Sequence, residues 1–240
     1  MNNFRADLHI HTVLSPCGSL DMSPINVVKQ AKNKRLHIIG ITDHNATQNA
    51  YVTQKIGEKE GVFVLLGVEV CTKEEIHCLA FFERKSELDE FQKYIDKYLP
   101  HIPNNVDKLG YQLIVDENEN IVDQLPYTLL SGIDQSIDQV KNEVEKNNGI
   151  FIPAHIDRPT FSISSQLGFI PPTLNPDAFE VSKYSSRILI LKQFPYIKQF
   201  NIIQDSDAHF IDDIGCVCNL FEMKELSFEN IKKELTKKYT

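Results

Sequence analysis

Short apolar runs alternate with longer amphipathic stretches through most of the chain. The run at residues 36–42 has no polar alternation, as expected of a strand buried on both faces of a parallel sheet. Repeated strand–helix units, with about seven to nine strands, favour a closed α/β barrel over an open sheet. We predict strands at 4–11, 36–42, 62–70, 75–82, 150–154, 177–182, 201–204 and 216–221, and helices at 24–35, before Gly61, at 86–99 and 137–148, and from about 227.

Residues 83–135 interrupt this alternation. Beyond the predicted helix, the stretch at 100–131 carries only two short predicted strands, around a turn at 117–120. We expect a single domain over residues 1–240, in which 83–135 form an insertion packed beside the barrel. The insertion is either a lid or an ordinary elaborated loop.

Composition limits the class of protein. Hydrophobic residues make up 42% of the 240 positions, which is enough for a barrel core. The net charge of -8 argues against a broad basic surface for nucleic acid. The five cysteines form no secreted disulfide framework and the N-terminus has no apolar signal core, so we expect a cytoplasmic protein. No run reaches the ~18 apolar residues of a membrane span, so we expect no membrane partner.

Histidines and carboxylates gather at the ends of the predicted strands. Imidazoles and carboxylates together form a ligand set for divalent metals. Side chains two apart on a strand point the same way, so a pair such as His9 and His11 can converge on one ion. The clusters are Asp7 with His9 and His11, Asp43 with His44, Glu69 with His77, His155 alone, and Asp207 with His209.

Some of these residues could be metal ligands or could have a structural role. Glu69 and His77 lie inside apolar runs, where an unpaired polar group is costly to bury, and metal ligation would remove that cost. Asp43 could orient a neighbouring imidazole. Cys17 is either a thiolate ligand or a turn residue. His37 and His101 have no acidic neighbours at strand ends, and we expect them to be surface or packing residues.

Three basic residues are candidates for binding a phosphate group. Arg158 follows His155 by three positions, and a guanidinium can bind phosphate oxygens bidentately. A surface salt bridge is an equally good interpretation of Arg158. Lys183 and Arg187 are weaker candidates for the same role.

Five of these motifs, in order from residue 7 to 209, resemble those of the PHP (polymerase and histidinol phosphatase) family. The resemblance implies a distorted (β/α)7 barrel, a trinuclear site for zinc, manganese or iron, and phosphoesterase activity. The motifs are Asp7-Leu8-His9-Ile10-His11-Thr12, Ile41-Thr42-Asp43-His44-Asn45, Gly67-Val68-Glu69-Val70 with His77, Pro153-Ala154-His155, and Asp205-Ser206-Asp207-Ala208-His209.

The resemblance also assigns the ligands. Many family members have a His or Asp ligand to the third ion where this chain has Cys17, and a thiolate there would favour zinc or ferrous iron over manganese. As the resemblance implies, the first ion is held by His9, His11, Glu69 and Asp207, the second by Glu69, His77 and His155, and the third by His44 and His209.

Such a site would activate a water for attack on phosphorus, with Asp43, Asp205 or His209 as candidate proton carriers. We expect a small phosphomonoester or a nucleotide as substrate, because the chain is acidic. We would favour a nucleic-acid exonuclease if Arg158, Lys183 and Arg187 formed a groove with aromatic neighbours. A third hypothesis is a non-catalytic regulatory domain stabilised by metal, against which the nearly complete ligand set argues.

Overall fold

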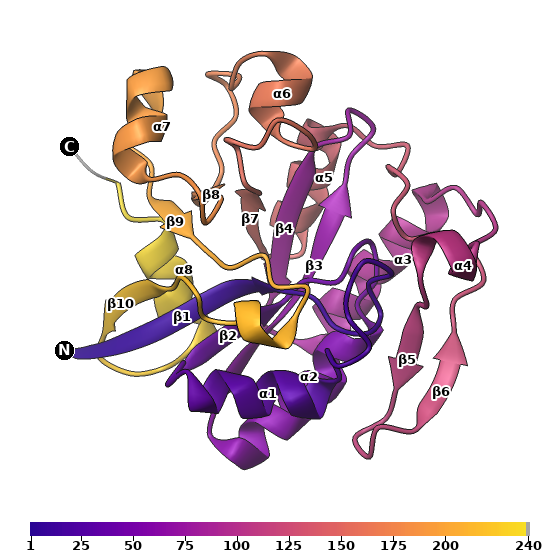
Figure 1. The fold of residues 1–240 in the computed structure, drawn as a ribbon. Helices are drawn as coiled ribbons and strands as arrows, with labels where there is room; N and C mark the ends of the chain where they lie inside the picture. Colours follow the sequence, from indigo (N-terminus) through magenta and orange to yellow (C-terminus); the bar gives the residue numbers. More distant parts are fainter. Residues whose placement is uncertain (239–240) are drawn as a thin grey trace.

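The computed structural model describes residues 1–238, and its centre is a curled mixed sheet in the order β10-β1-β2-β3-β4-β7 (Figure 1). Strands β1, β2 and β3 are parallel, whereas β4 is antiparallel to β3 and β7, and β10 is antiparallel to β1. The strands are β1 (Asn2–Ile10), β2 (Ile38–Ile41), β3 (Phe63–Cys71), β4 (His77–Phe82), β5 (Leu113–Val115), β6 (Ile121–Gln124), β7 (Ile150–Pro153), β8 (Phe179–Val181), β9 (Ile202–Gln204) and β10 (Asn219–Met223).

The parallel pair β8 and β9 continues the curl of the sheet back towards β1. The amide of Asp177, just before β8, donates to the Phe151 carbonyl of β7 over 3.0 Å. Beyond β9, an isolated parallel bridge joins Ala208 to Ile10 at the end of β1. The strands β1 to β4 and β7 to β9 therefore follow one another around a distorted barrel, which confirms the predicted (β/α)7 fold class.

Strand β4 departs from the parallel arrangement that the sequence predicted. A tight turn joins β3 to β4, in which the Thr72 amide donates to the Ile76 carbonyl over 2.9 Å and Glu75 has a φ of 59°. Because this connection is too short to contain a crossover helix, β4 returns antiparallel to β3. The first residue of β4, His77, consequently lies beside the last residues of β3.

Apolar cores lie on both faces of the sheet. One packs the strands against α1, α2, α3 and α5, and the other lies on the opposite face together with α8. The ring of Phe81 packs over Gly40 and Gly67, where an added Cβ would lie 2.8 Å and 2.5 Å from it. The helices are α1 (Pro24–Asn33), α2 (Gln48–Glu60), α3 (Lys85–Tyr98), α4 (Val106–Leu109), α5 (Ile137–Lys146), α6 (Ile163–Leu167), α7 (Arg187–Gln193) and α8 (Phe228–Leu235), with 3-10 turns η1 (Pro195–Ile197) and η2 (Ile211–Asp213).

The segment 83–135 lies beside the barrel, with its hairpin β5–β6 next to α2 (Figure 1). The Asn49 side chain donates to the Leu113 carbonyl and accepts from the Val115 amide. Glu117, in the turn between the two strands, forms ion pairs with Lys55 and Lys59. The two short strands expected around residues 117–120 are therefore present, and they are anchored to the outside of α2.

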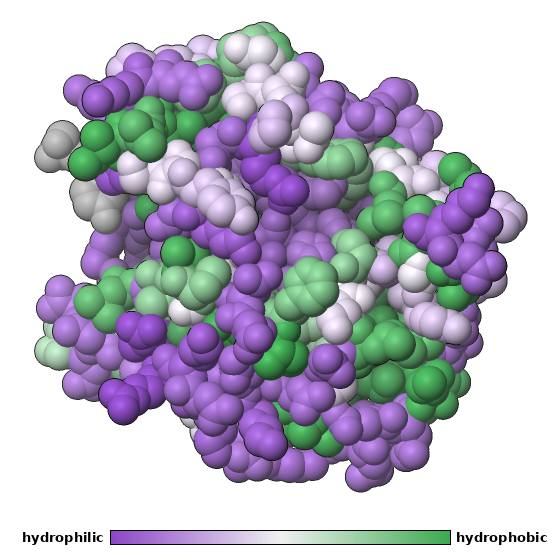
Figure 2. All heavy atoms as spheres, viewed as in Figure 1, coloured by the Kyte–Doolittle hydropathy of each residue, from purple (hydrophilic) through white to green (hydrophobic). Residues whose placement is uncertain are grey.

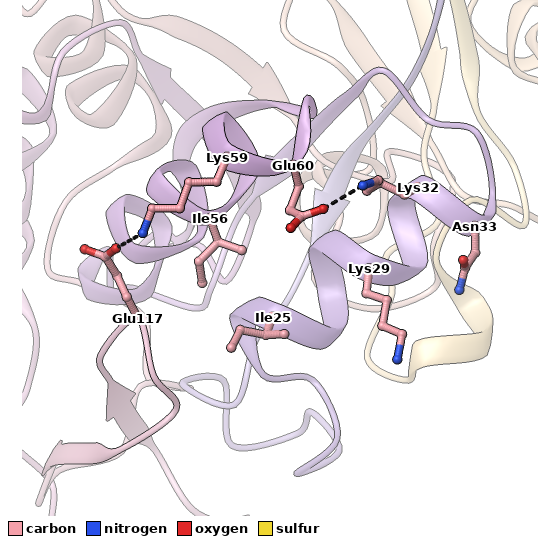
Figure 3. A pocket seen from close by; sticks show the side chains of 8 residues that line it. All are labelled: Ile25, Lys29, Lys32, Asn33, Ile56, Lys59, Glu60 and Glu117. Carbon is pink, nitrogen blue, oxygen red and sulfur yellow. Dashed lines mark hydrogen bonds and ion pairs between the residues drawn. The ribbon is translucent and has the colours of Figure 1, made fainter.

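A cavity of about 450 Å³ lies between α1, α2 and the hairpin (Figure 3). Its walls carry the ion pairs Lys32–Glu60 and Lys59–Glu117, which partly neutralise its lysines. No histidine or cysteine lines it, so it is separate from the candidate chemistry. Within residues 1–238, no helix has both the length and the apolar character needed to cross a membrane.

Candidate metal centre

The carboxylate of Glu69, near the end of β3, lies among five histidines in the middle of the barrel mouth. Figure 2 shows this face hollowed at its centre, with mainly hydrophilic side chains in the hollow. Glu69 is buried, and its Oε2 atom accepts no hydrogen bond within the described residues. The nearest ring nitrogens to Oε1 are those of His77 (2.9 Å), His155 (3.1 Å) and His9 (3.3 Å), and those nearest to Oε2 are His44 (2.9 Å) and His11 (3.4 Å).

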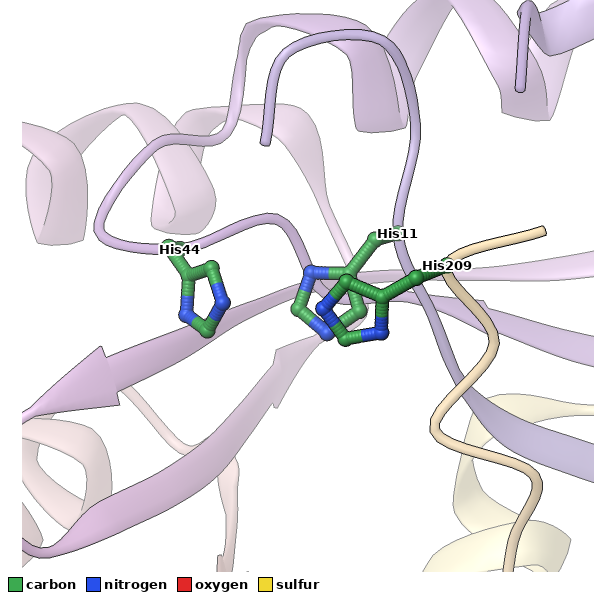
Figure 4. Close-up of side chains that lie close together, drawn as sticks. All are labelled: His11, His44 and His209. Atoms are coloured by element: carbon green, nitrogen blue, oxygen red, sulfur yellow. The ribbon is translucent and has the colours of Figure 1, made fainter. Parts of the chain in front are cut away.

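The imidazoles approach one another as closely as they approach Glu69. The Nε2 atoms of His9 and His11 are 3.3 Å apart. The rings of His11 and His209 are stacked with centroids 4.1 Å apart, and His44 lies 4.6 Å from His11 (Figure 4). In three groups of residues, the potential ligand atoms all lie within 4.8 Å of one another. These groups are His11, His44 and His209; His9, His11 and Glu69; and His44, Glu69 and His77.

This donor set fits cations better than it fits hydrogen bonds alone. A neutral imidazole has one N–H, so crowded ring nitrogens cannot all find hydrogen-bond partners among themselves. Glu69 Oε2 is buried and accepts no hydrogen bond within the described residues, although His44 Nδ1 lies 2.9 Å away, and an oxygen in that setting is costly to bury unless a cation satisfies it. Nitrogen and carboxylate donors in overlapping groups indicate a polynuclear metal site.

Asp207 connects this cluster to Arg158. Its Oδ1 atom lies 3.4 Å from His11 Nε2 and 3.5 Å from both His9 Nε2 and His209 Nδ1. Its Oδ2 atom accepts a hydrogen bond from Arg158 Nη1 over 2.6 Å. Asp207 has a φ of 50°, a backbone conformation that non-glycine residues adopt rarely and that is common at functional sites.

Charge and burial act in opposite directions on these groups. Burial raises the pKa values of Glu69 and Asp207, but neighbouring histidines outweigh it and hold both carboxyl groups well below their usual range. Burial lowers the pKa of His11 well below its usual value and that of His77 to about 4. Burial also lowers the pKa values of His9 and His44, but the charge of Glu180 outweighs it at His9 and that of Glu69 outweighs it at His44, so both pKa values lie well above the usual value. Metal ligation requires ionised carboxylates and neutral imidazoles, so His9 and His44 would release protons when a cation binds.

Glu180, the middle residue of β8, contacts the cluster and was not among the candidates from the motif pattern. Its Oε1 atom lies 2.8 Å from His9 Nδ1, and its Oε2 atom accepts a hydrogen bond from the His155 amide over 2.8 Å. A carboxylate on the far nitrogen of a ligand imidazole fixes the ring's orientation and tautomer. The signal that singled out Glu69, a carboxylate inside an apolar run, is also present at Ala178-Phe179-Glu180-Val181.

Asp43 faces away from the space between the histidines. Both of its oxygens accept hydrogen bonds, from the Thr12 amide, the Thr12 hydroxyl and the Ser15 hydroxyl, each over 2.7 Å. Ser15 Oγ in turn lies 2.9 Å from His11 Nδ1 and accepts from the His44 amide. This arrangement favours a positioning role for Asp43 over proton transfer.

Asp205 ties the end of the barrel to β1. Its Oδ1 atom accepts from the Leu8 amide over 2.7 Å and from the Asn219 side chain over 2.8 Å. Burial raises its pKa well above the usual range, and the charges of Glu180 and Asp7 raise it further. The bonds that Asp205 makes are structural ones, which also weakens its case as a proton carrier.

Cys17 lies at the rim of the cluster. The residue as a whole is exposed, but its thiol faces the cluster and is largely enclosed, and it lines a cavity of about 250 Å³ together with His44 and His209. Burial of the thiol raises its pKa, but hydrogen bonds from His209 and His44 outweigh this effect and lower the pKa to about 6. A thiolate at this position is available to a cation beside the two histidines.

The three basic candidates have different surroundings. Arg158 and Lys183 line a second cavity, of about 300 Å³, next to the cluster, and Lys183 Nζ lies 3.3 Å from Asp213 Oδ1. Arg187 donates instead to the backbone carbonyls of Lys198 and Phe200 and is not among the residues that line this cavity. Of the three basic residues that the sequence suggested for a groove, only Arg158 and Lys183 therefore line the same cavity.

The remaining histidines lie outside the cluster, as predicted. His37 is exposed and accepts a hydrogen bond from the Arg5 amide. His101 is exposed and stacks on Tyr127 with ring centroids 4.4 Å apart.

Both the sequence and the fold of the chain match those of known proteins. The PHP domain model matches residues 7–156. An uncharacterized protein of Methanocaldococcus jannaschii, MJ1587, is 37% identical over 78 residues, which are 29% of this chain and 46% of that protein. A two-domain protein from Bacteroides vulgatus, containing a predicted PHP-like metal-dependent phosphoesterase, has a TM-score of 0.58 at 15% identity over 98% of this chain and 63% of its own.

The fold is also similar to that of endonuclease Q. The lesion-specific endonuclease from Pyrococcus furiosus superposes with a TM-score of 0.74 at 20% identity, over 98% of this chain and 56% of that chain. Endonuclease Q in complex with a 27-mer duplex carrying an abasic lesion at the active site gives a TM-score of 0.67 at 20% identity, over 97% and 56%. The chain thus spans about half the length of MJ1587 and of endonuclease Q.

Proposed function

Because the chain belongs to the PHP domain family, we propose that it is a metal-dependent phosphoesterase that hydrolyses a phosphate ester with water in a polynuclear site. The observation that carries the proposal is the setting of Glu69. Its two oxygens face five imidazoles within 3.4 Å, and its Oε2 atom accepts no hydrogen bond in the described part of the chain. Cations held between these groups would remove the cost of burying them.

The proposed site holds up to three divalent ions, drawn from zinc, manganese and iron. When bound, such ions supply an acidified water and polarise the phosphoryl oxygens. The proposed ligands are His9, His11, Glu69 and Asp207 for the first ion, Glu69, His77 and His155 for the second, and Cys17, His44 and His209 for the third.

Other groups of the chain orient the ligands and handle substrate and proton. Glu180 orients His9, and Asp43 orients His11 through the Ser15 hydroxyl. Arg158, held at the rim by Asp207, is proposed to bind the phosphate. His209 has 21% of its side chain exposed, so of the three proton-carrier candidates it is best placed to exchange a proton with solvent.

The substrate we propose is a small phosphate ester or a nucleotide. Two cavities of about 250 and 300 Å³ adjoin at the cluster, since Cys17, Arg158, Asp207 and His209 line both. Phe161 stacks on His77 with ring centroids 4.8 Å apart and bounds the smaller cavity. Cavities of this size suit a compact ligand.

A nuclease of the same family is the second candidate. It is supported by the fold's similarity to endonuclease Q and by the aromatic side chains Tyr184 and Phe210, which line the larger cavity with Arg158 and Lys183. The net charge of -8 disfavours long polyanions. A non-catalytic, metal-stabilised regulatory domain is the third, and the nearly complete set of proposed ligands argues against it.

The test measures metal content and turnover on the same sample. Protein purified without chelator is expected to contain two to three ions per chain and to release phosphate from some members of a panel of sugar phosphates, nucleotides and oligonucleotides. His44→Ala should lower both readings, whereas His101→Ala, which changes an exposed histidine outside the cluster, should lower neither. Bound metal without turnover on any member of the panel would favour the regulatory-domain hypothesis, and absence of both metal and turnover after addition of zinc, manganese or iron would overturn the proposed site.

A further inference from the structure

The cavity of about 300 Å³ beside the metal cluster carries aromatic side chains that phosphate hydrolysis does not need. Tyr184 is 85% exposed and Phe210 is 58% exposed, and both line this cavity together with Arg158 and Lys183. Lys183 Nζ lies 5.8 Å from the centroid of the Tyr184 ring. Large apolar surfaces left open to water at a cavity mark a binding site for an apolar or aromatic group.

The turn that carries Tyr184 is held rigidly. The Ser182 amide and hydroxyl both donate to the Asp157 carboxylate, over 2.7 and 2.6 Å. The Gln204 side chain donates to the carbonyls of Ser182 and Ser185, each over 2.9 Å. The backbone that carries Tyr184 is therefore already ordered, so no backbone entropy of the turn has to be lost when a ligand stacks on the ring.

The backbone of Phe210 is also held by hydrogen bonds. Phe210 directly follows His209, whose carbonyl accepts from the Ser19 amide over 2.8 Å, and its own carbonyl accepts from Asp213. Arg158 lines both this cavity and the smaller one that reaches Glu69. A ligand whose phosphate lies at the cluster can therefore extend a second group past Arg158 into the cavity that Tyr184 and Phe210 line.

We propose that this cavity is a nucleobase subsite, so that the substrate is a nucleoside phosphate whose base stacks on Tyr184 and Phe210. The inference rests on the phosphoesterase function proposed above and narrows its substrate class. Aromatic faces beside cationic side chains are the combination that binds a base next to its phosphate. The base can come from a mononucleotide or from an unpaired nucleotide in a strand.

The test compares adenosine 5′-monophosphate with ribose 5-phosphate, which carries a hydroxyl group in place of the base. For the metal-loaded protein we measure phosphate release from each and, by calorimetry, the affinity for each. The wild type should prefer the nucleotide. Tyr184→Ala and Phe210→Ala should each reduce this preference by about 5- to 150-fold, the range of base stacking. Phe169→Ala, which removes an exposed ring outside the cavity, should leave the preference unchanged.

Equal treatment of the two ligands by the wild type, or an unchanged preference in both cavity variants, would overturn the subsite. If neither ligand is hydrolysed, the calorimetric preference decides the subsite by itself, and the phosphoesterase proposal is decided separately by turnover of the wider panel described above. A 5′-phosphorylated single strand assayed beside the mononucleotide identifies the source of the base, and a preference for either over ribose 5-phosphate supports the proposal.

Discussion

Replacing Glu180 with glutamine is expected to weaken metal binding. Glu180 makes two contacts of 2.8 Å, one with His9 Nδ1 and one with the His155 amide. Both partners require an acceptor, and a glutamine amide offers only one oxygen, so one contact becomes donor against donor. Loss of a carboxylate that orients a ligand imidazole costs about 10- to 100-fold in metal affinity, or about 1.4 to 2.7 kcal/mol.

The assay is a competition titration of zinc between the protein and a chromophoric chelator. Glu222→Gln makes the same chemical change at an exposed position of β10 and serves as the matched control. A rise in Kd of tenfold or more is expected for Glu180→Gln alone. Identical Kd values for the wild type and both variants would refute the positioning role, and thermal unfolding of the metal-free proteins separates that role from a general loss of stability.

Three further predictions concern the ligands. His9→Ala should lose metal and activity together, and full turnover in this variant would contradict the site assignment. Cys17→Asp should shift the metal preference toward manganese by offering a harder donor; an unchanged preference would mean that Cys17 is not a ligand. In metal-free protein, burial raises the pKa of Cys17 but His209 and His44 bring it down to about 6, so its thiolate forms as the pH rises through that value. Alkylation followed by peptide mass spectrometry should therefore show a midpoint near pH 6 for Cys17 and a higher one for Cys216, whose pKa burial raises; a midpoint near 9 for Cys17 would show that the two histidines do not act on it.

Local patterns in the sequence were enough to predict most of the strands and helices. Strand β2 was predictable because its apolar run lacks alternation, as a doubly covered strand requires. Helix α1 begins where Ser23 caps it, accepting from the Asn26 amide, and α2 ends at Gly61, whose φ of 76° suits glycine. These signals depend on neighbours along the chain, so they can be interpreted without knowing the tertiary structure.

The features that the sequence did not reveal depend on contacts between distant residues. The reversal of β4 depends on how the turn after Cys71 folds back, and an apolar strand has the same composition in either direction. Arg187 differs from Arg158 only in what tertiary folding puts beside it, which is backbone carbonyls in one case and Asp207 in the other. Glu180 was missed, although a carboxylate inside an apolar run is the same signal that identified Glu69.

The way the barrel closes has a consequence for the order of folding. Glu69 and His77 are eight residues apart along the chain and meet through a hairpin, so this part of the site can form early. The bond from Leu8 to Asp205 spans 197 residues, and the bridge from Ile10 to Ala208 is equally remote. Loop closure over such distances comes late. The complete set of proposed ligands therefore exists only after the C-terminal segment has docked on β1, and metal uptake should report the last step of folding rather than nucleate the first.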